Sequence, residues 1–89
     1  MERTKIKVTG DVQGVSYRFW MKMRAEELGL LGWIKNEADG TVTVEVEGQR
    51  ETIEKYLKLA EQGSPLAEVD KIETEMSDYT GQFKKFEIR

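Results

Sequence analysis

The stretch Gly10-Asp11-Val12-Gln13-Gly14-Val15-Ser16-Tyr17-Arg18 holds the residues best suited to chemistry in this chain of 89 residues. It follows a short run of alternating apolar residues and leads into a segment with helical periodicity. A glycine-containing turn from a strand into a helix gathers the unpaired N–H groups of the first helical turn and the positive end of the helix dipole. Arg18 adds a fork of donors that matches phosphate oxygens. The spacing indicates an anion-binding loop, although such a turn is also often only a tight connection.

The loop matches neither of two common phosphate-binding motifs. The Gly-Lys-Ser/Thr sequence of a Walker A loop is missing. The glycine spacing also differs from that of the dinucleotide-binding fingerprint. Any anion bound here would be held by a different arrangement.

The composition excludes several kinds of site. The chain has no cysteine and no histidine, which removes thiolate nucleophiles, disulfides, the usual zinc sites, serine–histidine pairs and the commonest general base. Catalysis would have to use arginine, amide, backbone or carboxylate groups, so we predict no metal site and no cofactor. The formal charge of −3 supplies no broad basic field, and no basic–aromatic RNA-binding motif is present. We therefore predict no nucleic-acid partner.

The ends of the chain suggest a simple organisation. The start, Met1-Glu2-Arg3-Thr4-Lys5, lacks the apolar run of a signal peptide, and no segment has the composition of a membrane span. The length is that of one small domain, which we assign to residues 1–89. A cytoplasmic monomer is the default expectation.

Periodicity predicts the first two elements on either side of the loop. Residues 4–9 alternate as a strand with one buried face. Ser16 is the expected N-cap, and apolar residues follow it at helical spacing until Gly29 stops the helix. Phe19 and Trp20 flank this stripe and are expected to extend the buried face. The stripe consists of Tyr17, Met21, Ala25 and Leu28.

The rest of the chain predicts a hairpin, a second helix and two further strands. Strands at 30–36 and 41–47 are joined by a loop of about four or five residues around Asp39-Gly40. A helix follows, with the apolar stripe Ile53, Tyr56, Leu57 and Ala60, and it is stopped by Gly63 and Pro65. Weaker strands lie at 69–76, with Ile72, Thr74 and Met76 on one face, and at 83–88.

This order defines an α+β fold class. Strand, helix, strand, strand, helix, strand, with a short fifth strand, is the ferredoxin-like arrangement (βαββαβ). It places two helices on one face of a mainly antiparallel sheet. The fold alone names no function, because unrelated activities share it.

Asn36 is the second residue suited to chemistry, since it lies where the chain leaves the strand at 30–36. It can be a simple turn residue, or an amide that holds a water molecule by one donor and one acceptor. For Trp33 we favour core filling over base stacking, and for Tyr17 packing on the helix face. The acidic residues have no metal-site spacing and are expected on the solvated surface; they are Glu26, Glu27, Glu37 and Asp39.

Two stretches together resemble the signatures of the acylphosphatases. Gly10 to Arg18 is similar to the first, Gly-x-Val-Gln-Gly-Val-x-Phe/Tyr-Arg. Gly32-Trp33-Ile34-Lys35-Asn36, followed by Asp39-Gly40-Thr41-Val42 and Gly48, is similar to the second. Leu28-Gly29-Leu30, Gly63-Ser64-Pro65 and Phe86-Glu87-Ile88 extend the resemblance over nearly the whole chain. Asp11 departs from the family pattern, which commonly has a basic or neutral residue there.

The resemblance implies a hydrolase that cleaves the carboxyl–phosphate bond of acyl phosphates to a carboxylate and inorganic phosphate, without a metal or cofactor. Its partner would be a small-molecule acyl phosphate substrate. It implies that the backbone of Gln13, Gly14, Val15, Ser16, Tyr17 and Arg18 cradles the phosphate. Arg18 would pair with the phosphate oxygens, and Asn36 would orient the attacking water. The main structural assumption is that the glycine loop and Asn36 converge.

A binding module is the competing class. Acylphosphatase-like domains also occur within larger carbamoyl-transfer proteins, and ferredoxin-like domains often bind RNA or amino acids. Release of inorganic phosphate from a small acyl phosphate, without added metal, distinguishes an enzyme from a ligand-binding module.

Overall fold

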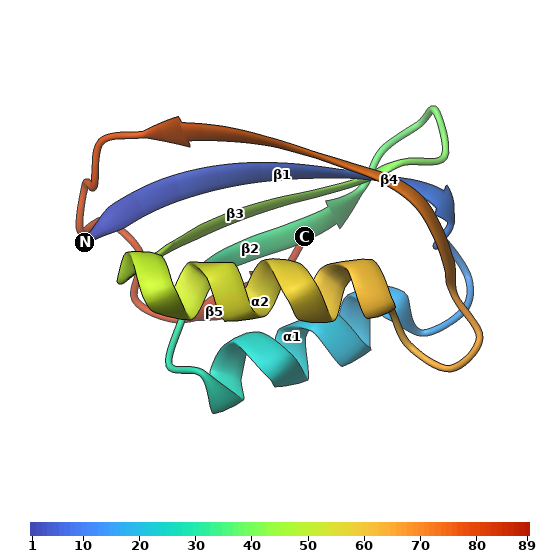
Figure 1. Ribbon diagram of the computed structural model, residues 1–89, viewed down its shortest axis with the longest axis horizontal. Coiled ribbons are helices and arrows are strands. Elements are labelled where there is room, and N and C mark those ends of the chain that lie inside the picture. The colour runs from blue at the N-terminus through green and yellow to red at the C-terminus, as the bar shows by residue number, and fades with distance from the viewer.

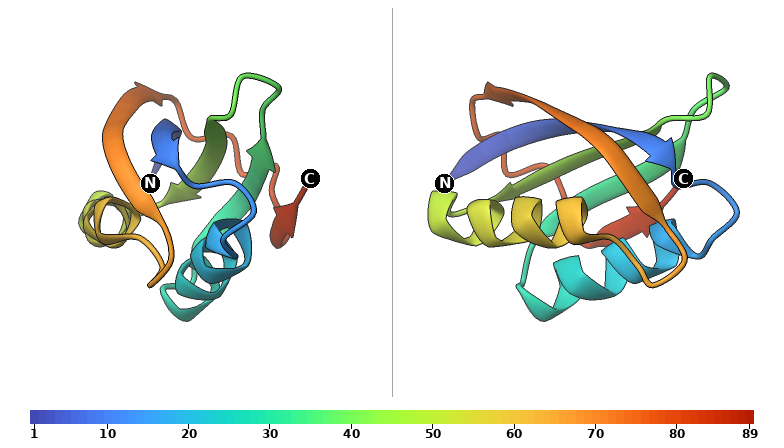
Figure 2. Two further views of the ribbon diagram at one scale, coloured as in Figure 1. Left: turned by 90° about the vertical axis from the view of Figure 1, so that its right-hand side faces the viewer. Right: turned by 45° about the vertical axis from the view of Figure 1, so that its right-hand side comes forward.

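The computed structural model describes residues 1–89 as a five-stranded sheet with two helices. The strand order is β4-β1-β3-β2-β5. The elements are β1 (Glu2–Asp11), α1 (Tyr17–Glu27), β2 (Leu31–Asn36), β3 (Val42–Gly48), α2 (Arg50–Gln62), β4 (Glu68–Ser77) and β5 (Phe86–Ile88). The predicted ferredoxin-like class is confirmed, with both helices packed on one face of the sheet (Figures 1 and 2).

The pairing of the strands is antiparallel except at one edge. β1 pairs with β3 and β4, and β2 pairs with β3, all antiparallel. β5 is shorter than the predicted strand at 83–88 and runs parallel to β2, with Ile88 opposite Ile34. Ile72, Thr74 and Met76 of β4 share the predicted face, because they pair in turn with Val8, Ile6 and Thr4.

The core lies between the helices and the sheet. Alternation along β1 and β3 turns Ile6, Val8 and the valines of β3 inward, where they are fully buried. The helix stripes meet them as predicted, through Tyr17, Met21 and Ala25 of α1 and through Ile53, Tyr56 and Ala60 of α2.

Two buried tyrosines cross-link the helices. The hydroxyl of Tyr17 in α1 donates to the carbonyl of Ala60 in α2 at 2.9 Å. The hydroxyl of Tyr56 in α2 donates back to the carbonyl of Met21 in α1 at 3.0 Å. Burial raises the pKa of both phenols, so both stay neutral donors at physiological pH. The first turn of α1 is thereby fixed against α2, which holds the end of the glycine loop in place.

Three expectations need correction. Trp33 was expected in the core, but strand alternation turns it to the sheet face opposite the buried Ile34, where the Arg89 guanidinium lies 5.1 Å from its ring centroid. Phe19 does not extend the buried stripe, since it is 60% exposed. Ser16 is the residue before α1, as predicted, but its side chain makes no capping hydrogen bond.

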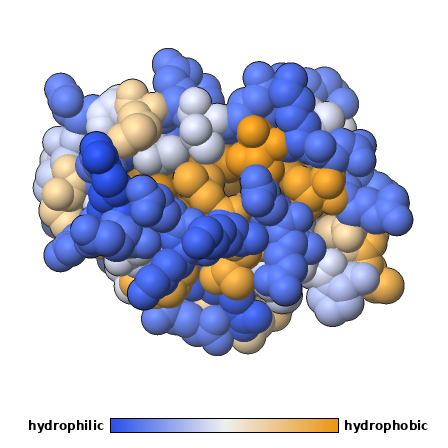
Figure 3. All heavy atoms as spheres, in the orientation of Figure 1, coloured by the Kyte–Doolittle hydropathy of each residue, from blue (hydrophilic) through white to orange (hydrophobic).

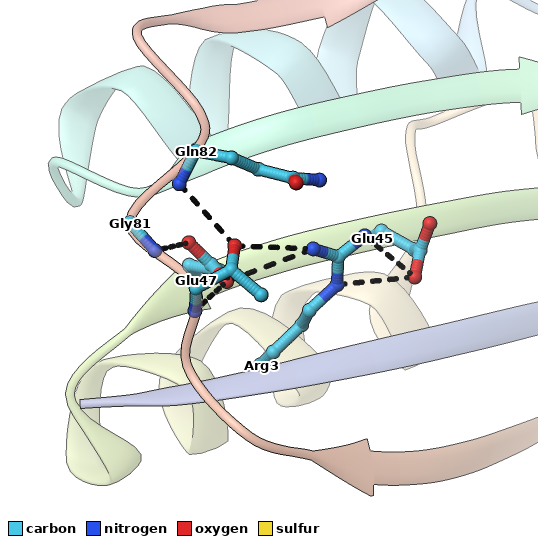
Figure 4. A network of polar contacts seen from close by, with 6 residues as sticks. Arg3, Glu45, Glu47, Gly81 and Gln82 are labelled. Carbon is cyan, nitrogen blue, oxygen red and sulfur yellow. Dashed lines mark hydrogen bonds and ion pairs between the residues drawn. The ribbon is translucent and has the colours of Figure 1, made fainter.

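A buried carboxylate on β3 clamps the connection from β4 to β5 onto the sheet. Glu47 accepts hydrogen bonds from the N–H of Thr80 at 2.7 Å, the hydroxyl of Thr80 at 2.8 Å and the N–H of Gly81 at 3.0 Å (Figure 4). The guanidinium of Arg3 lies 3.8 Å away and also bonds to Glu45 at 3.3 Å. This clamp fixes where the chain crosses to place β5 beside β2.

On the face drawn in Figure 3, hydrophilic residues dominate, and hydrophobic residues emerge between them. On the side of α2, Ile53 and Leu57 line a groove against Met76 of β4, and the Glu2–Arg50 ion pair lies at its border. No helix is both long and apolar enough to cross a bilayer.

We predict that Glu47→Ala destabilises the fold by about 1–3 kcal/mol, because it removes the acceptor of the part-buried hydrogen bonds from Thr80 and Gly81. Chemical denaturation measures this change. The neighbouring Glu45→Ala is the matched control, since Glu45 is partly exposed and bonds only to Arg3. Equal losses in the two variants would contradict the clamp.

The same clamp predicts a pH dependence. Burial alone would raise the pKa of Glu47, but the hydrogen bonds from Thr80 and Gly81 and the nearby Arg3 outweigh it and hold the pKa below its usual value of 4.5. A lowered pKa in the folded state contributes stability above pH 4.5 that is lost as the pH falls through the folded-state pKa. The difference in the free energy of unfolding between the wild type and Glu47→Gln, measured by chemical denaturation, should therefore become smaller below pH 4.5.

Candidate active site

The connection from β1 to α1 presents a run of free backbone donors. Gly14 has a φ of 75° and Ser16 a φ of 63°, so two left-handed residues flank Val15. Such a conformation turns successive N–H groups toward one concavity, a typical anion nest. The N–H groups of residues 13–19 donate no hydrogen bond elsewhere in the chain; the first donor after them is Trp20, which bonds to Ser16. Ser16 adopts an uncommon conformation for a residue with a side chain, as strained functional loops often do.

Arg18 lies in the first turn of α1 and lines a small hollow beside this loop. The hollow has a volume of about 140 Å³. Its wall is formed by Val12, Gly14, Ser16, Tyr17, Arg18, Phe19 and Ile88. The Arg18 side chain is partly buried and forms no ion pair with any carboxylate. A cation that is left without a counter-ion beside free N–H donors can bind an anion.

Asn36 is the last residue of β2 and pairs with Val42 of β3, which on its other side pairs with Val8 near the end of β1. The end of β2 and the loop after β1 therefore lie at the same end of the sheet (Figure 2). Its Oδ1 atom is buried and accepts no hydrogen bond from the chain. A buried polar atom without a partner costs free energy, so its presence calls for a functional explanation.

Gln13 joins the two halves of the site. Its Nε2 atom donates to the carbonyl of Glu37 at 2.8 Å and to the carbonyl of Thr41 at 2.9 Å. These carbonyls belong to the two ends of the five-residue connection that follows Asn36. One amide therefore ties the glycine loop to the turn that positions Asn36.

The turn after Asn36 is itself rigid. The carboxylate of Asp39 accepts hydrogen bonds from the N–H of Thr41 at 3.0 Å and from its hydroxyl at 2.6 Å. The hydroxyl bond, followed by the N–H bond, lowers the pKa of Asp39 and keeps it ionised. The predicted Asp39-Gly40 hairpin is confirmed, and its rigidity fixes the carbonyls that receive Gln13.

A second contact supports the loop from the other side. The hydroxyl of Ser64, just beyond α2, donates to the carbonyl of Val15 at 3.3 Å. The loop is thus held by the hairpin on one side and by the α2–β4 connection on the other (Figure 2).

The sequence pointed to the loop, Arg18 and Asn36, and the structure brings these to one end of the sheet. The exposed Asp11 lies at the end of β1, outside the wall of the hollow. Sequence reasoning missed the amide bridge of Gln13, the support from Ser64 and the place of Ile88 in the wall. For the bridge of Gln13, the only signal in the sequence was the family motif, which includes a glutamine at position 13. No cluster of three or more acidic side chains is placed to hold a metal ion.

Fold and site together define a class of protein: a small α+β domain with a run of free backbone N–H donors between its first strand and first helix. The family model described as Acylphosphatase matches residues 4–88. An acylphosphatase of Pelotomaculum thermopropionicum is 45% identical over 86 residues, which cover 97% of this chain and 94% of that protein.

Solved structures agree with this. The crystal structure of acylphosphatase from Bacillus subtilis superposes with a TM-score of 0.97 at 32% identity, covering 100% of this chain and 99% of that one. Full-length HypF in its phosphate- and nucleotide-bound form matches with a TM-score of 0.86 at 28% identity, covering 99% of this chain but only 12% of that one. The chain belongs to the acylphosphatase family. It is a hydrolase that acts on acyl phosphates.

We predict that Gln13→Ala lowers kcat for acyl phosphate hydrolysis by about 10- to 100-fold. The variant loses the bridge that positions Asn36 relative to the glycine loop, and groups that are slightly misplaced lose much of their effect on the rate. Steady-state kinetics with acetyl phosphate measures this. Gln62→Ala is the matched control, since Gln62 is an exposed glutamine at the end of α2. An unchanged kcat in Gln13→Ala would show that the bridge is not needed for catalysis.

Proposed function

We propose that the backbone of residues 13–18 and the side chain of Arg18 bind the phosphoryl group of an acyl phosphate, and that Asn36 orients the water that attacks phosphorus. The observation that carries this proposal is the run of free N–H groups at residues 13–19, with the unpaired Arg18 guanidinium at their side. Phosphate oxygens are strong acceptors, and each free donor and the guanidinium can bond to one.

The chemistry needs little from the protein beyond positioning. Water attacks phosphorus, the bond from phosphorus to the acyl oxygen breaks, and the carboxylate leaves with the bonding electrons. The proton of the attacking water passes to a phosphate oxygen of the substrate. Because a carboxylate is a good leaving group, fixed donors aimed at the phosphoryl oxygens can stabilise the transition state without a protein nucleophile.

Asn36 suits the role of a water-positioning group. Its Oδ1 is a buried acceptor without a partner, and its amide also offers two donors. A water molecule held by such an amide is oriented in two directions at once. The bridge from Gln13 to the turn after Asn36 supports a fixed separation between the amide and the phosphate cradle.

The remaining parts of the proposal concern the setting. We take residues 1–89 as one acylphosphatase domain, acting as a monomer in the cytoplasm on small-molecule acyl phosphates. The net charge of −3 and the alternating charges on the open sheet face favour neither nucleic acid nor an anionic membrane surface as a partner.

For Arg18→Gln we expect kcat/KM for acetyl phosphate to fall at least about 100-fold, because a charged donor to the transition state is lost. The inhibition constant of inorganic phosphate should rise in parallel. Lys22→Gln removes a positive charge one helical turn further along α1 and should change both values little. Near-normal turnover in a folded Arg18→Gln variant would refute the assignment.

Asn36→Ala should lower kcat by about 100-fold while the inhibition constant of phosphate changes little, because the water is lost and the cradle remains. The melting temperature should hold or rise, since the variant removes a buried acceptor that has no partner. Loss of phosphate binding with an intact turnover number would assign Asn36 to the cradle instead.

A further inference from the structure

An apolar groove adjoins the phosphate hollow and lies between α1 and the connection from α2 to β4. It has a volume of about 240 Å³. Its wall is apolar apart from Ser16 and Ser64, and consists of Val15, Phe19, Trp20, Met23, Pro65 and Leu66.

The groove and the hollow share two residues. Ser16 and Phe19 line both. A substrate whose phosphoryl group occupies the hollow therefore has the groove as the neighbouring surface for the rest of the molecule. This continuity identifies the acyl group of the substrate as the occupant.

The exposure of the groove residues is unusual for a chain with so modest a core. Phe19 is 60% exposed, Met23 is 41% exposed and Leu66 is 73% exposed, and all three lie around this one groove. Isolated exposed apolar residues need no explanation, but a contiguous group beside a binding site marks a binding surface.

The chemistry of the wall selects one kind of acyl group. No charged side chain lines the groove, in contrast to the hollow with Arg18. The hydroxyl of Ser64 is engaged with the carbonyl of Val15. The Arg24 guanidinium stacks 5.2 Å from the ring centroid of Trp20, which braces this ring as a wall. The groove thus offers apolar contact and no cationic partner for a second carboxylate.

We propose that this groove binds the acyl group of the substrate and makes the enzyme selective for apolar acyl phosphates over short or dicarboxylic ones. The proposal rests on the assignment of the phosphate cradle. Phe19, Met23 and Leu66 act as specificity residues, and the proposed reaction at phosphorus is unchanged. An alkyl chain that moves from water into the groove buries apolar surface. Each buried methylene group therefore strengthens the binding of the transition state.

The test is a series of acyl phosphates: acetyl, butyryl, hexanoyl and succinyl phosphate. For the wild type we expect kcat/KM to rise about threefold per added methylene group until the groove is filled. The value of kcat/KM for succinyl phosphate should be lower than that for butyryl phosphate. A flat series in the wild type would overturn the proposal.

Variants of Leu66 place the effect in the groove. Leu66→Ala should lower the hexanoyl-to-acetyl ratio of kcat/KM several-fold, and Leu66→Lys should raise the succinyl-to-butyryl ratio by pairing with the free carboxylate. Met76→Ala and Met76→Lys are matched controls, because Met76 is an exposed apolar residue on β4, away from the groove. Ratios that stay the same in both Leu66 variants would overturn the proposal.

Two further outcomes separate this proposal from others. If Arg18→Gln retains turnover, the phosphate cradle is wrong, whatever the chain-length series shows. If sedimentation instead reveals a dimer that Leu66→Lys dissociates, and the ratios do not move, the groove is an interface between copies of the chain and the acyl proposal fails.

Discussion

The side-chain amide of Gln13 connects the two parts of the site that come from distant stretches of sequence. It bonds at once to the carbonyls of Glu37 and Thr41, which close the turn after Asn36. Backbone donors that bind a ligand cannot also stabilise the loop that carries them. A loop with free N–H groups at residues 13–19 therefore depends on contacts made by its side chains and carbonyls. Gln13 and Ser64 supply those contacts from opposite sides.

The rest of the fold holds the ends of this loop. β1 pairs with β3 as far as Val8 and with β4 as far as Asp11, so the point at which the loop begins is anchored to the sheet through β4. The point at which it ends is fixed by Tyr17, which is buried and bonded to α2. Glu47 acts further away by fixing the crossing that brings β5, and with it Ile88, to the wall of the hollow. These contacts thus hold a loop whose backbone N–H groups remain unpaired.

The sequence predicted most of the fold, because its elements repeat simple periods. Alternation gave the inward residues of β1 and β3, and the spacing of Tyr17, Met21 and Ala25 gave the buried face of α1. The prediction that Trp33 lies in the core was wrong, because a large aromatic residue on a strand fits either face of the sheet. Which face it takes depends on the register of the strand. The prediction that Phe19 is buried was wrong for a related reason. Its position next to the apolar stripe does not show whether another element covers it. The parallel pairing of β5 depends on the clamp at Glu47, whose partners lie more than thirty residues away.

Within the candidate site, the sequence indicated which residues are suited to chemistry but not which contacts hold them in place. Arg18 and Asn36 stand out because their side chains suit phosphate and water, and the family motifs contain both. The bridge from Gln13 crosses 24 and 28 residues to reach carbonyl groups, and carbonyl acceptors leave no trace in a sequence. The free N–H groups depend on the left-handed conformation of Ser16, a residue that usually avoids it. Such features emerge only from the folded chain.

The most direct test of the central claim is a crystal structure of the protein with inorganic phosphate, the product. We expect one phosphate whose oxygens accept hydrogen bonds from the backbone N–H groups of residues 13–18 and from the Arg18 guanidinium. A water molecule or phosphate oxygen should lie within hydrogen-bond distance of the Asn36 amide. Phosphate bound only at surface lysines, with the loop donors facing solvent, would contradict the account.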